Sequence, residues 1–468
     1  MATKDQAHWN ETKYRRILET FDADDSPIIA SGPNGEYDSI CQSGELTDKG
    51  RATTLALGEW LRHLYVEQLG FMPKLIMNAD NIYLRTTPVP RALESLQQSF
   101  WGMYPAHTRT AQFPAPTIVT RSPADETLYL NKTNCRRFAQ LSQAFSQRTA
   151  DHWNESKEMN YLNKLISTWM PLNSRRVAVD SHPSLYDIMD TINSTLAHGL
   201  ETRLPSEFYN SKGRDIMDRI VVEEWVSGFN ESEEYRSLGV GSLVGDIVTR
   251  MAGNVIENRH DSVLELGGEG AKLGRSRIGE AGIRFGLSVC HDTTLAAVLA
   301  SLGTFNGKKW PPYTSHIAVE LFRKARPIDP YNAPKTTSDS VQVRQAETET
   351  KPKTWWFALF GKAKDVLDSG PSKPSVTARR PVEDLTDQEK RGLDGYYVRL
   401  RYNDKIMTVP GCKPAGKHFP DDESFCTLEA FKSITDKYTP ANWKQACSSD
   451  LDKAAFPALL QSSGLAQS

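Results

Sequence analysis

The 468-residue chain carries 56 basic and 58 acidic side chains, and 39% of its residues are hydrophobic. This balance is typical of a globular protein with a large core and two structural units. A formal net charge of −2 gives no reason to expect a nucleic acid or an anionic membrane as a partner. No uncharged apolar run approaches the roughly 20 residues that span a bilayer, so we expect no membrane span.

The cellular location is left open by the sequence. The N-terminus has no apolar stretch of the signal-peptide kind, which predicts a cytoplasmic protein as written. Cysteines and glycosylation sequons point instead to the secretory pathway or the extracellular space, which we expect if the N-terminus is truncated. The six cysteines are Cys41, Cys135, Cys290, Cys412, Cys426 and Cys447, and the sequons begin at Asn10, Asn131, Asn154, Asn193 and Asn230.

Residues 1–107 predict the N-terminal part of an α/β domain. A helix is expected over 46–70, where Thr47 can cap the first turn and apolar residues recur at helical spacing. Two runs of strand length follow, at 75–77 and 82–84, and a helical pattern resumes at 92–100. Strand, polar turn and helix in this order build α/β sheets, whose ligands lie at the carboxyl ends of strands.

Residues 108–280 are polar and mostly helical in pattern, which predicts an inserted α-helical domain. The α/β domain resumes over 281–324, with strands expected at 285–290 and 315–322 and a helix at 293–302.

Residues 325–394 are dominated by Pro, Lys, Thr, Ser, Asp and Glu, which predicts a long disordered insertion. Within it, Thr354–Asp368 is expected either to fold back onto a nearby groove or to form a short amphipathic helix that docks on the protein or on lipid. Residues 395–468 predict a hairpin that turns at Asn403 and a Cys-bearing tail.

Two places combine a strand end with side chains that can act on an anion. Arg85 follows the run 82–84 and has hydroxyls beside it, and a guanidinium offers a planar fork of donors to two phosphate oxygens. His291 and Asp292 come directly after the strand at 285–290, where a helix start favours an anionic group. The alternatives are an Arg85 that pairs with a carboxylate, a structural His291, and an Asp292 that caps its helix.

The ordered motifs of the chain resemble those of histidine acid phosphatases. They are Gly44-Glu45-Leu46-Thr47-Asp48-Lys49-Gly50, Leu57 to Arg62, Tyr83 to Leu93, and Cys290-His291-Asp292-Thr293-Thr294-Leu295. This family includes acid phosphatases, phytases, lysophosphatidic acid phosphatases and phosphoxylose phosphatases, and residues 41–50 are most similar to the last two groups. The resemblance covers residues 41–107 and 283–450 and is looser across the helical insert.

The resemblance implies a phosphoglycerate-mutase-like α/β sandwich with a large α-helical cap, and hydrolysis of a small-molecule phosphomonoester through a phosphohistidine. Arg85 would hold the phosphoryl group, His291 would donate a hydrogen bond to it, and Asp292 would protonate the leaving alkoxide. Arg91 would support the turn. The family requires no metal or other cofactor, and the oligomeric state stays open.

The family's nucleophile lies in an Arg-His-Gly-x-Arg motif before the first helix, and the chain contains no Arg-His-Gly. The pairs Arg62-His63 and Arg259-His260 lie downstream, and His8 has no strand before it, so none replaces the nucleophile. We expect a truncated N-terminus and an inactive or nearly inactive chain. Family analogy also pairs Cys412 with Cys426 and Cys135 with Cys447, with Cys290 buried and reduced and Cys41 bonded within the lost segment.

Two other functions are compatible with the sequence. The first is a non-catalytic protein that binds phosphorylated ligands in the cleft or a partner through residues 325–394. The second is a mutase that acts on phosphoglycerate, because mutases share the broader fold. The helical insert and the His291-Asp292 pair favour the phosphatase over the mutase.

Overall fold

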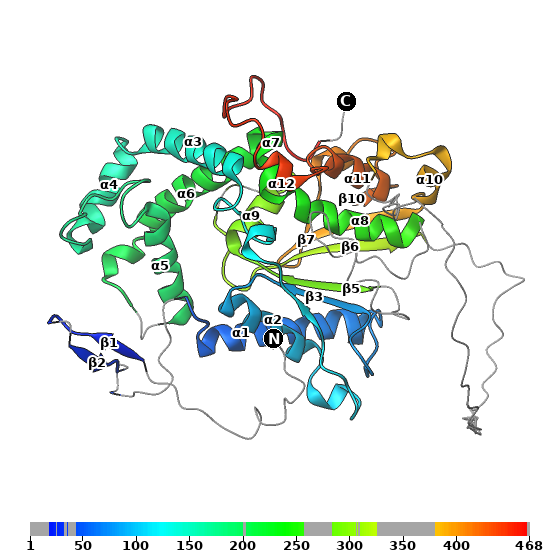
Figure 1. Cartoon of the computed structure of the whole chain (residues 1–468), viewed down its shortest axis with the longest axis horizontal. Helices are drawn as coiled ribbons and strands as arrows, with labels where there is room; N and C mark the ends of the chain where they lie inside the picture. Colours follow the sequence, from blue (N-terminus) through cyan, green and yellow to red (C-terminus); the bar gives the residue numbers. More distant parts are fainter. Residues whose placement is uncertain are drawn as a thin grey trace, which may run out of the picture.

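The computed structural model describes residues 18–24, 26–31, 35, 44–199, 203–256, 283–305, 307, 309–324 and 380–465. Cys41, the sequon at Asn10, the island 354–368 and most of the predicted insertion lie outside these residues. Figure 1 shows a sheet region with helices above and below it, and a helical region at one end. No helix among the described residues has the length and apolar character needed to cross a membrane.

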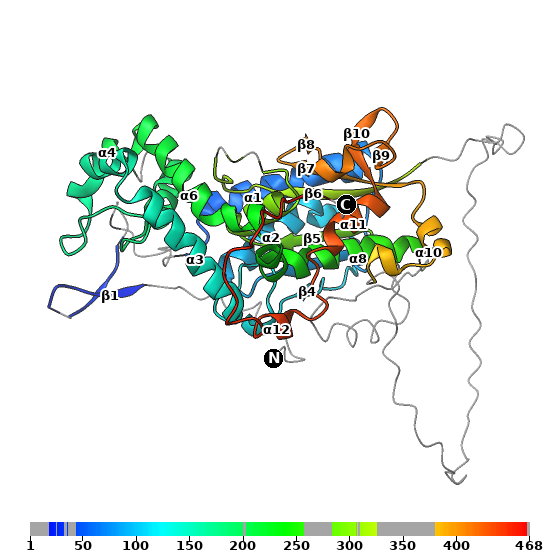
Figure 2. The same cartoon turned by 90° about the horizontal axis from the view of Figure 1, so that it is seen from above.

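The strands of the α/β region form two neighbouring sheets. The first is parallel, in the order β4-β3-β5, and the second is antiparallel, in the order β6-β7-β10-β9, with β8 also paired to β7. The strand bounds are β3 Ile82–Thr86, β4 Ile118–Val119, β5 Phe285–Val289, β6 Ile317–Arg323, β7 Tyr396–Tyr402, β8 Lys405–Met407, β9 His418–Phe419 and β10 Asp422–Thr427. A separate hairpin, β1 (Glu19–Phe21) and β2 (Pro27–Ile29), lies away from these sheets in Figures 1 and 2.

One side of the parallel sheet is covered by α1 (Asp48–Arg62) and α2 (Pro90–Met103), as Figure 1 shows. As predicted, the Thr47 hydroxyl caps α1 by accepting a hydrogen bond from the Gly50 N–H at 3.1 Å. The two helices approach so closely that a Cβ atom on Gly58 would lie 2.1 Å from the Ser99 carbonyl oxygen. Only glycine permits this contact, and it brings the two helices together as one layer.

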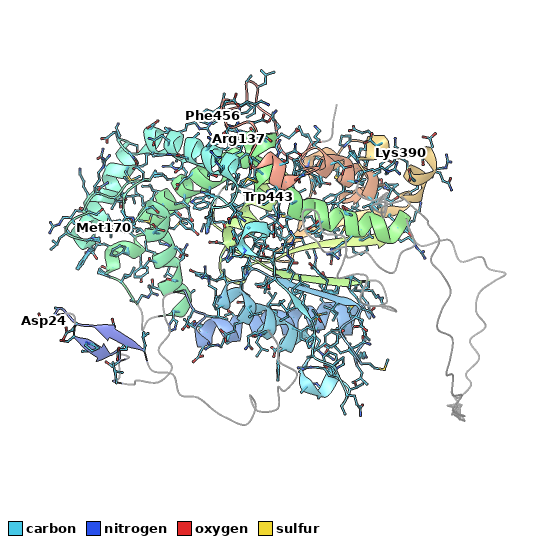
Figure 3. All side chains as sticks on the ribbon, in the orientation of Figure 1. Asp24, Arg137, Met170, Lys390, Trp443 and Phe456 are labelled. Carbon is cyan, nitrogen blue, oxygen red and sulfur yellow. A yellow bond between two sulfur atoms is a disulfide. The ribbon has the colours of Figure 1, made fainter. Side chains whose placement is uncertain are left out.

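The predicted helical insert is confirmed as part of the fold. Its helices are α3 (Arg136–Trp153), α4 (Lys157–Ile166), α5 (Leu185–His198), α6 (Ser211–Glu231) and α7 (Glu233–Arg236). Figure 3 shows Met170 at the outer edge of this region and Trp443, from α12 (Trp443–Ala446), inside the packed core. The Trp443 indole donates to the Leu238 carbonyl at 2.8 Å, which links the C-terminal tail to the insert.

Both ends of the segment 108–280 contribute to the α/β region. β4 pairs in parallel with β3, although only two residues form the strand and no periodic pattern marks it. At the other end, α8 (Ser242–Ile256) lies along the sheets beside α11 (Leu428–Asp436) in both views, opposite α1 and α2. The tertiary boundary of the insert is therefore narrower than the sequence pattern indicates.

The C-terminal part is ordered earlier than predicted. Residues 380–394 were expected to be disordered, yet they contain α10 (Asp387–Gly392), which begins with a capping box between Thr386 and Glu389. Val382, Leu385 and Leu393 are buried against the rest of the protein. Widely spaced apolar residues in a polar segment can still dock on a core, and this is why composition alone misplaced the boundary. The predicted hairpin is confirmed as β7 and β8, with Asn403 and Asp404 at positive φ.

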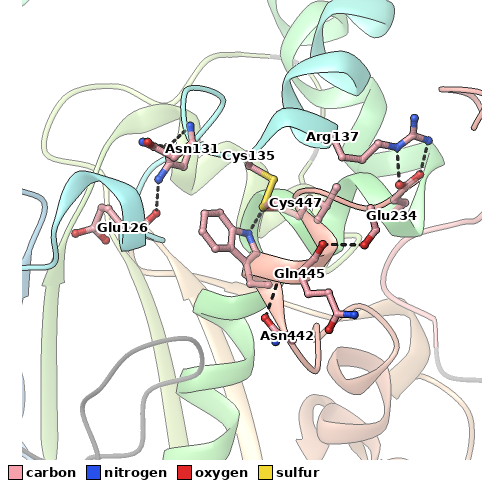
Figure 4. Close-up of a disulfide and its surroundings, with 12 residues drawn as sticks. Glu126, Asn131, Cys135, Arg137, Glu234, Asn442, Gln445 and Cys447 are labelled. Atoms are coloured by element: carbon pink, nitrogen blue, oxygen red, sulfur yellow. Dashed lines mark hydrogen bonds and ion pairs between the residues drawn. A yellow bond between two sulfur atoms is a disulfide. The ribbon is translucent and has the colours of Figure 1, made fainter. Parts of the chain in front are cut away.

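Both expected disulfides are present. Cys135 is bonded to Cys447 and Cys412 to Cys426, while Cys290 is not in a disulfide. Figure 4 shows the first disulfide at the start of α3, next to the ion pair of Arg137 with Glu234. This disulfide joins the helical insert to the C-terminal tail.

The predicted sequon at Asn131 is not available for glycosylation in the folded protein. Its side chain is 2% exposed, and its amide donates to the carbonyls of Pro123 and Glu126 at 2.8 and 3.1 Å. Asn230 is exposed, at the end of α6. The prediction of a glycoprotein therefore depends on the other sequons.

The two disulfides are expected to differ in their effect on stability. Cys135 and Cys447 are 312 residues apart, and Cys412 and Cys426 are 14 apart. Because loop-closure entropy grows with loop length, the chain-entropy model gives about 3 kcal/mol for the short loop and roughly 2 to 3 kcal/mol more for the long one. Replacing both members of each pair by Ser should lower the midpoint of urea unfolding more for Cys135/Cys447. An equal or reversed order would contradict the constraint assigned to the long loop.

Candidate active site

The pairing of β3 with β5 brings the two predicted motifs together. In this parallel register, Arg85 lies opposite Ser288 and Thr86 opposite Val289. The next residue, Thr87, has its Oγ1 atom 3.3 Å from Nε2 of His291. The Arg85 and His291 motifs therefore converge at the carboxyl ends of two neighbouring strands, where α/β sheets place their ligand sites.

Asp292 is fixed by two hydrogen bonds at the start of α9 (Asp292–Ser301). Its Oδ1 accepts from the Thr293 N–H at 2.7 Å, and its Oδ2 accepts from the Trp310 indole at 2.6 Å. The N-cap position of α9 is His291 and carries no side-chain capping bond, so the capping role that the sequence left open for Asp292 is not observed. The carboxyl is thus held in one orientation next to His291, with one oxygen on the helix and one on the loop after α9.

Arg85 is deeply buried and pairs with a carboxylate, which was the alternative reading of this residue. Its Nη2 lies 2.7 Å from Oε1 of Glu126, and the two side chains are 2% and 0% exposed. Glu126 also accepts from the N–H groups of Thr127 and Leu128 at 2.8 and 2.7 Å. The carboxylate is therefore rigid, and it fixes the direction of the guanidinium.

Charged side chains gather around Arg85 in the interior. Among the described residues they include the guanidiniums of Arg85, Arg121 and Arg250 and the carboxylates of Glu126 and Asp246. Arg121 lies 3.1 Å from Asp246, and Nη1 of Arg85 lies 4.0 Å from the same carboxylate. In a medium of low polarity a guanidinium attracts an anion more strongly than it does at the surface.

Burial changes the protonation of both central residues. Desolvation, and then the charge of Arg121, lower the pKa of Arg85 to about 10, so the guanidinium stays charged at neutral pH. Desolvation, and then the charge of Arg91, lower the pKa of His291 to about 4. Over most of the physiological range His291 is therefore a neutral imidazole, which can donate one hydrogen bond and accept another.

The helical insert adds a rim to this site that the sequence analysis did not identify. Tyr186 and Asp190 come from α5, and Trp310 and Tyr313 come from the loop before β6. The Tyr313 hydroxyl donates to Oδ1 of Asp190 at 3.0 Å, and the Tyr186 ring contacts Trp310 edge-on at 5.6 Å. The available signal in the sequence is the aromatic and proline-rich run Trp310-Pro311-Pro312-Tyr313 before the strand expected at 315–322.

Next to the site, the two sheets are not joined by strand pairing. β5 pairs with β3 and β6 pairs with β7, and no pairing between β5 and β6 occurs in the described part of the chain. The two strands nevertheless lie side by side in Figures 1 and 2. Gly286 and Ser288 of β5 are exposed, and a Cβ built on Gly286 would meet no atom within 4 Å. The hydrophobic core is divided in the same way. β5 packs on the cluster that contains α1 and α2, and β6 packs on a second cluster that contains the helical insert and the C-terminal part.

Of the histidines rejected as nucleophiles, the structure describes His63. His63 lies 3.4 Å from Glu67, in a π-helical segment that continues α1 on the outer surface. His8 and Arg259-His260 fall outside the described residues. No group of three or more His, Cys, Asp or Glu side chains that could hold a metal ion occurs in the ranges that the structure describes.

Comparison with known proteins gives a consistent set of similarities. The family model of the histidine phosphatase superfamily (branch 2) matches residues 1–344. A probable acid phosphatase of Schizosaccharomyces pombe is 31% identical over 449 residues, which cover 95% of this chain and 84% of that protein.

More distant relatives match a smaller share of their own length. Counting factor 60 of Dictyostelium discoideum is 23% identical and human lysophosphatidic acid phosphatase type 6 is 24% identical, with 62% and 57% of those proteins covered. The chain thus spans about three fifths of these relatives. Among solved structures, the apo form of Hafnia alvei phytase is 12% identical with a TM-score of 0.49, and the match covers 89% of this chain and 91% of that one.

Removing one partner of the Arg85–Glu126 ion pair should destabilise the folded protein more than replacing both partners with apolar side chains. Glu126→Gln keeps the shape but leaves a buried guanidinium with less compensation, so the free energy of unfolding should fall by about 3 to 5 kcal/mol. Replacing both residues, by Arg85→Met and Glu126→Leu, should recover much of this loss. Urea unfolding of the three proteins measures it, and a Glu126→Gln variant as stable as the parent would contradict the buried pair.

The lowered pKa of His291 should make the protein less stable in acid. The folded protein resists protonation of this group, so its contribution is complete above pH 6.5 and is lost as the pH falls from 6.5 towards 4. The loss should reach up to about 3 kcal/mol. Unfolding experiments across this range should show a shallower slope for His291→Gln, while His107→Gln, at an exposed site, should keep the parent slope. Identical slopes for all three proteins would show that His291 titrates normally.

Proposed function

Because the chain belongs to branch 2 of the histidine phosphatase superfamily, we propose that its site binds the phosphoryl group of a small-molecule phosphomonoester. The observation that carries this proposal is the 3.3 Å contact between Thr87 and His291, which brings the two anion-binding motifs to one place. The buried guanidinium of Arg85 supports an anionic ligand.

In this proposal each residue has a distinct role. Arg85 offers guanidinium donors to the phosphoryl oxygens, held in place by Glu126. His291, neutral above acidic pH, donates a hydrogen bond to the same group. Asp292 acts as the general acid that gives a proton to the leaving oxygen. Arg91 donates to the Gly44 carbonyl at 3.2 Å, in accordance with a supporting role at the turn.

We further propose that hydrolysis needs a nucleophilic histidine that the 468 residues do not supply. The chain contains no Arg-His-Gly sequence. In the part of the chain that the structure describes, no strand pairs with the second edge of β5 or of β6, which supports a position for an additional strand beside His291. A strand that ended there would present its next residues to the phosphoryl group, and a phosphohistidine could then form and be hydrolysed.

The insert between residues 108 and 280 is proposed to act as a cap over this site. Its helices α5 and α6 face the carboxyl ends of the strands in Figure 1, and Tyr186 and Asp190 reach the loop next to Asp292. The relatives include proteins named acid phosphatase and lysophosphatidic acid phosphatase, which supports a phosphomonoester as the substrate class.

A second candidate function is the binding of a phosphorylated ligand without turnover. It is favoured by the same absence of an Arg-His-Gly sequence, because Arg85 and His291 can hold a phosphate without forming a covalent bond. The two functions differ in turnover and share the binding site.

Calorimetric titration with inorganic phosphate, together with p-nitrophenyl phosphate hydrolysis at mildly acidic pH, tests the proposal. We expect phosphate to bind, Arg85→Gln to weaken binding by about tenfold or more, as for the loss of a charged hydrogen bond, and turnover to be near background. His107→Gln, far from both motifs, should bind as the parent does.

Two outcomes would contradict the proposal in different ways. Phosphate binding that is unaffected by Arg85→Gln would remove the assigned site. Robust turnover that His291→Ala abolishes would show that the chain holds its own nucleophile and that its identity has been missed.

A further inference from the structure

We propose that the rim made by Tyr186, Asp190 and Tyr313 is the subsite for the alcohol part of the substrate, and that it selects hydroxylated alcohols with a single phosphate. This inference rests on the proposed function, since it assumes that the phosphoryl group binds at Arg85 and His291. It adds a substrate class and assigns it to residues of the helical insert and of the loop before β6.

The position of Asp292 determines on which side the alcohol leaves. A general acid must lie next to the oxygen that it protonates, so the alcohol projects from the phosphoryl group on the Asp292 side. Asp292 is bound to the Trp310 indole at 2.6 Å, and Trp310 contacts the Tyr186 ring. The alcohol therefore emerges towards α5 and the loop that carries Tyr313.

The rim is accessible and carries hydrogen-bonding groups. Asp190 is exposed, and Tyr313 is 54% exposed. Their mutual hydrogen bond, at 3.0 Å, uses Oδ1 of the carboxylate and orients both side chains. A carboxylate accepts hydrogen bonds from hydroxyl groups, and aromatic faces pack against the C–H faces of a carbon skeleton. These are the contacts that a polyhydroxylated alcohol makes.

The charges on this side of the site disfavour a second phosphate. After the larger effect of burial, the charges of Asp292, Asp190 and Asp187 each raise the pKa of the Tyr186 hydroxyl. Burial raises the pKa of Asp190, the hydrogen bond from Tyr313 lowers it, and the charge of Asp292 raises it further. Negative charge is thus concentrated where the alcohol would lie, and an additional phosphate there would be repelled.

Arg91 and Lys132 are the cations that act near this rim among the described residues. Arg91 lowers the pKa of Asp190 and offsets one carboxylate, since its hydrogen bond to the neutral Gly44 carbonyl leaves its charge in place. Lys132 packs over the Trp225 ring at 4.4 Å, and the nearby Glu224 carboxylate balances its charge. The described carboxylates that act on Tyr186, which are Asp292, Asp190 and Asp187, therefore outnumber the one cation that offsets them.

The matched ligands glucose 6-phosphate and glucose 1,6-bisphosphate differ by one phosphate and test the inference directly. Calorimetric titration of the full chain should give a Kd about fivefold to tenfold lower for the monophosphate, the size expected for one like-charge contact at a surface. Asp190→Asn should reduce this ratio to about 1 while the Kd for inorganic phosphate changes by less than about twofold. Asp151→Asn removes an exposed acid elsewhere on the insert and should leave the ratio unchanged.

Tyr313→Phe removes the hydrogen bond to Asp190 but keeps the Asp190 carboxylate. It therefore shows whether the preference comes from the charge of Asp190 or from the local structure that this bond holds. It should keep the preference for the monophosphate. A ratio unchanged by Asp190→Asn, with phosphate binding intact, would overturn the subsite alone. A chain that binds no phosphate at all would overturn the proposed function and the subsite together.

Discussion

The parallel pairing of β3 with β5 is the constraint on which the site depends. It puts Arg85 opposite Ser288, and it brings Thr87 to within 3.3 Å of His291. A shift of one residue in this register would send the side chain of Arg85 to the opposite face of the sheet. The buried ion pair with Glu126 also holds the Arg85 side chain in this position, because a guanidinium with a rigid partner has little freedom to rotate.

The sequence predicted the regular parts of the fold well. α1, α2, β3, β5 and the hairpin of β7 and β8 have strong periodicity or clear turn residues, and their positions agree with the structure. The two disulfides also agree with the family resemblance. The prediction was wrong at boundaries, where β4 and residues 380–394 are held by tertiary contacts and carry weak local signals.

The site was predictable in part, for a related reason. Arg85 lies near the carboxyl end of a recognisable strand, and His291 and Asp292 follow another, so their convergence could be inferred from α/β topology. Glu126 and Asp190 follow no strand, and nothing in their neighbourhood marks them as special. Glu126 becomes visible only through its 2.7 Å contact with Arg85, and Asp190 only through its hydrogen bond to Tyr313.

The proposed site has a buried part around Arg85 and an accessible rim at Asp190 and Tyr313. We propose that the buried part binds the phosphoryl group and that the rim binds the alcohol to which this group is attached. Asp292, which is held by Trp310, is the proposed proton donor. These roles rest on membership of the histidine phosphatase superfamily, and in the described part of the chain the edges of β5 and β6 next to the site carry no paired strand.

A crystal structure of the chain with bound tungstate, a phosphate analogue, would test the central claim most directly. We predict one tungstate with oxygens within hydrogen-bonding distance of both the Arg85 guanidinium and Nε2 of His291. Tungstate bound elsewhere, or bound to only one of these residues while the other faces away, would contradict a single phosphoryl pocket.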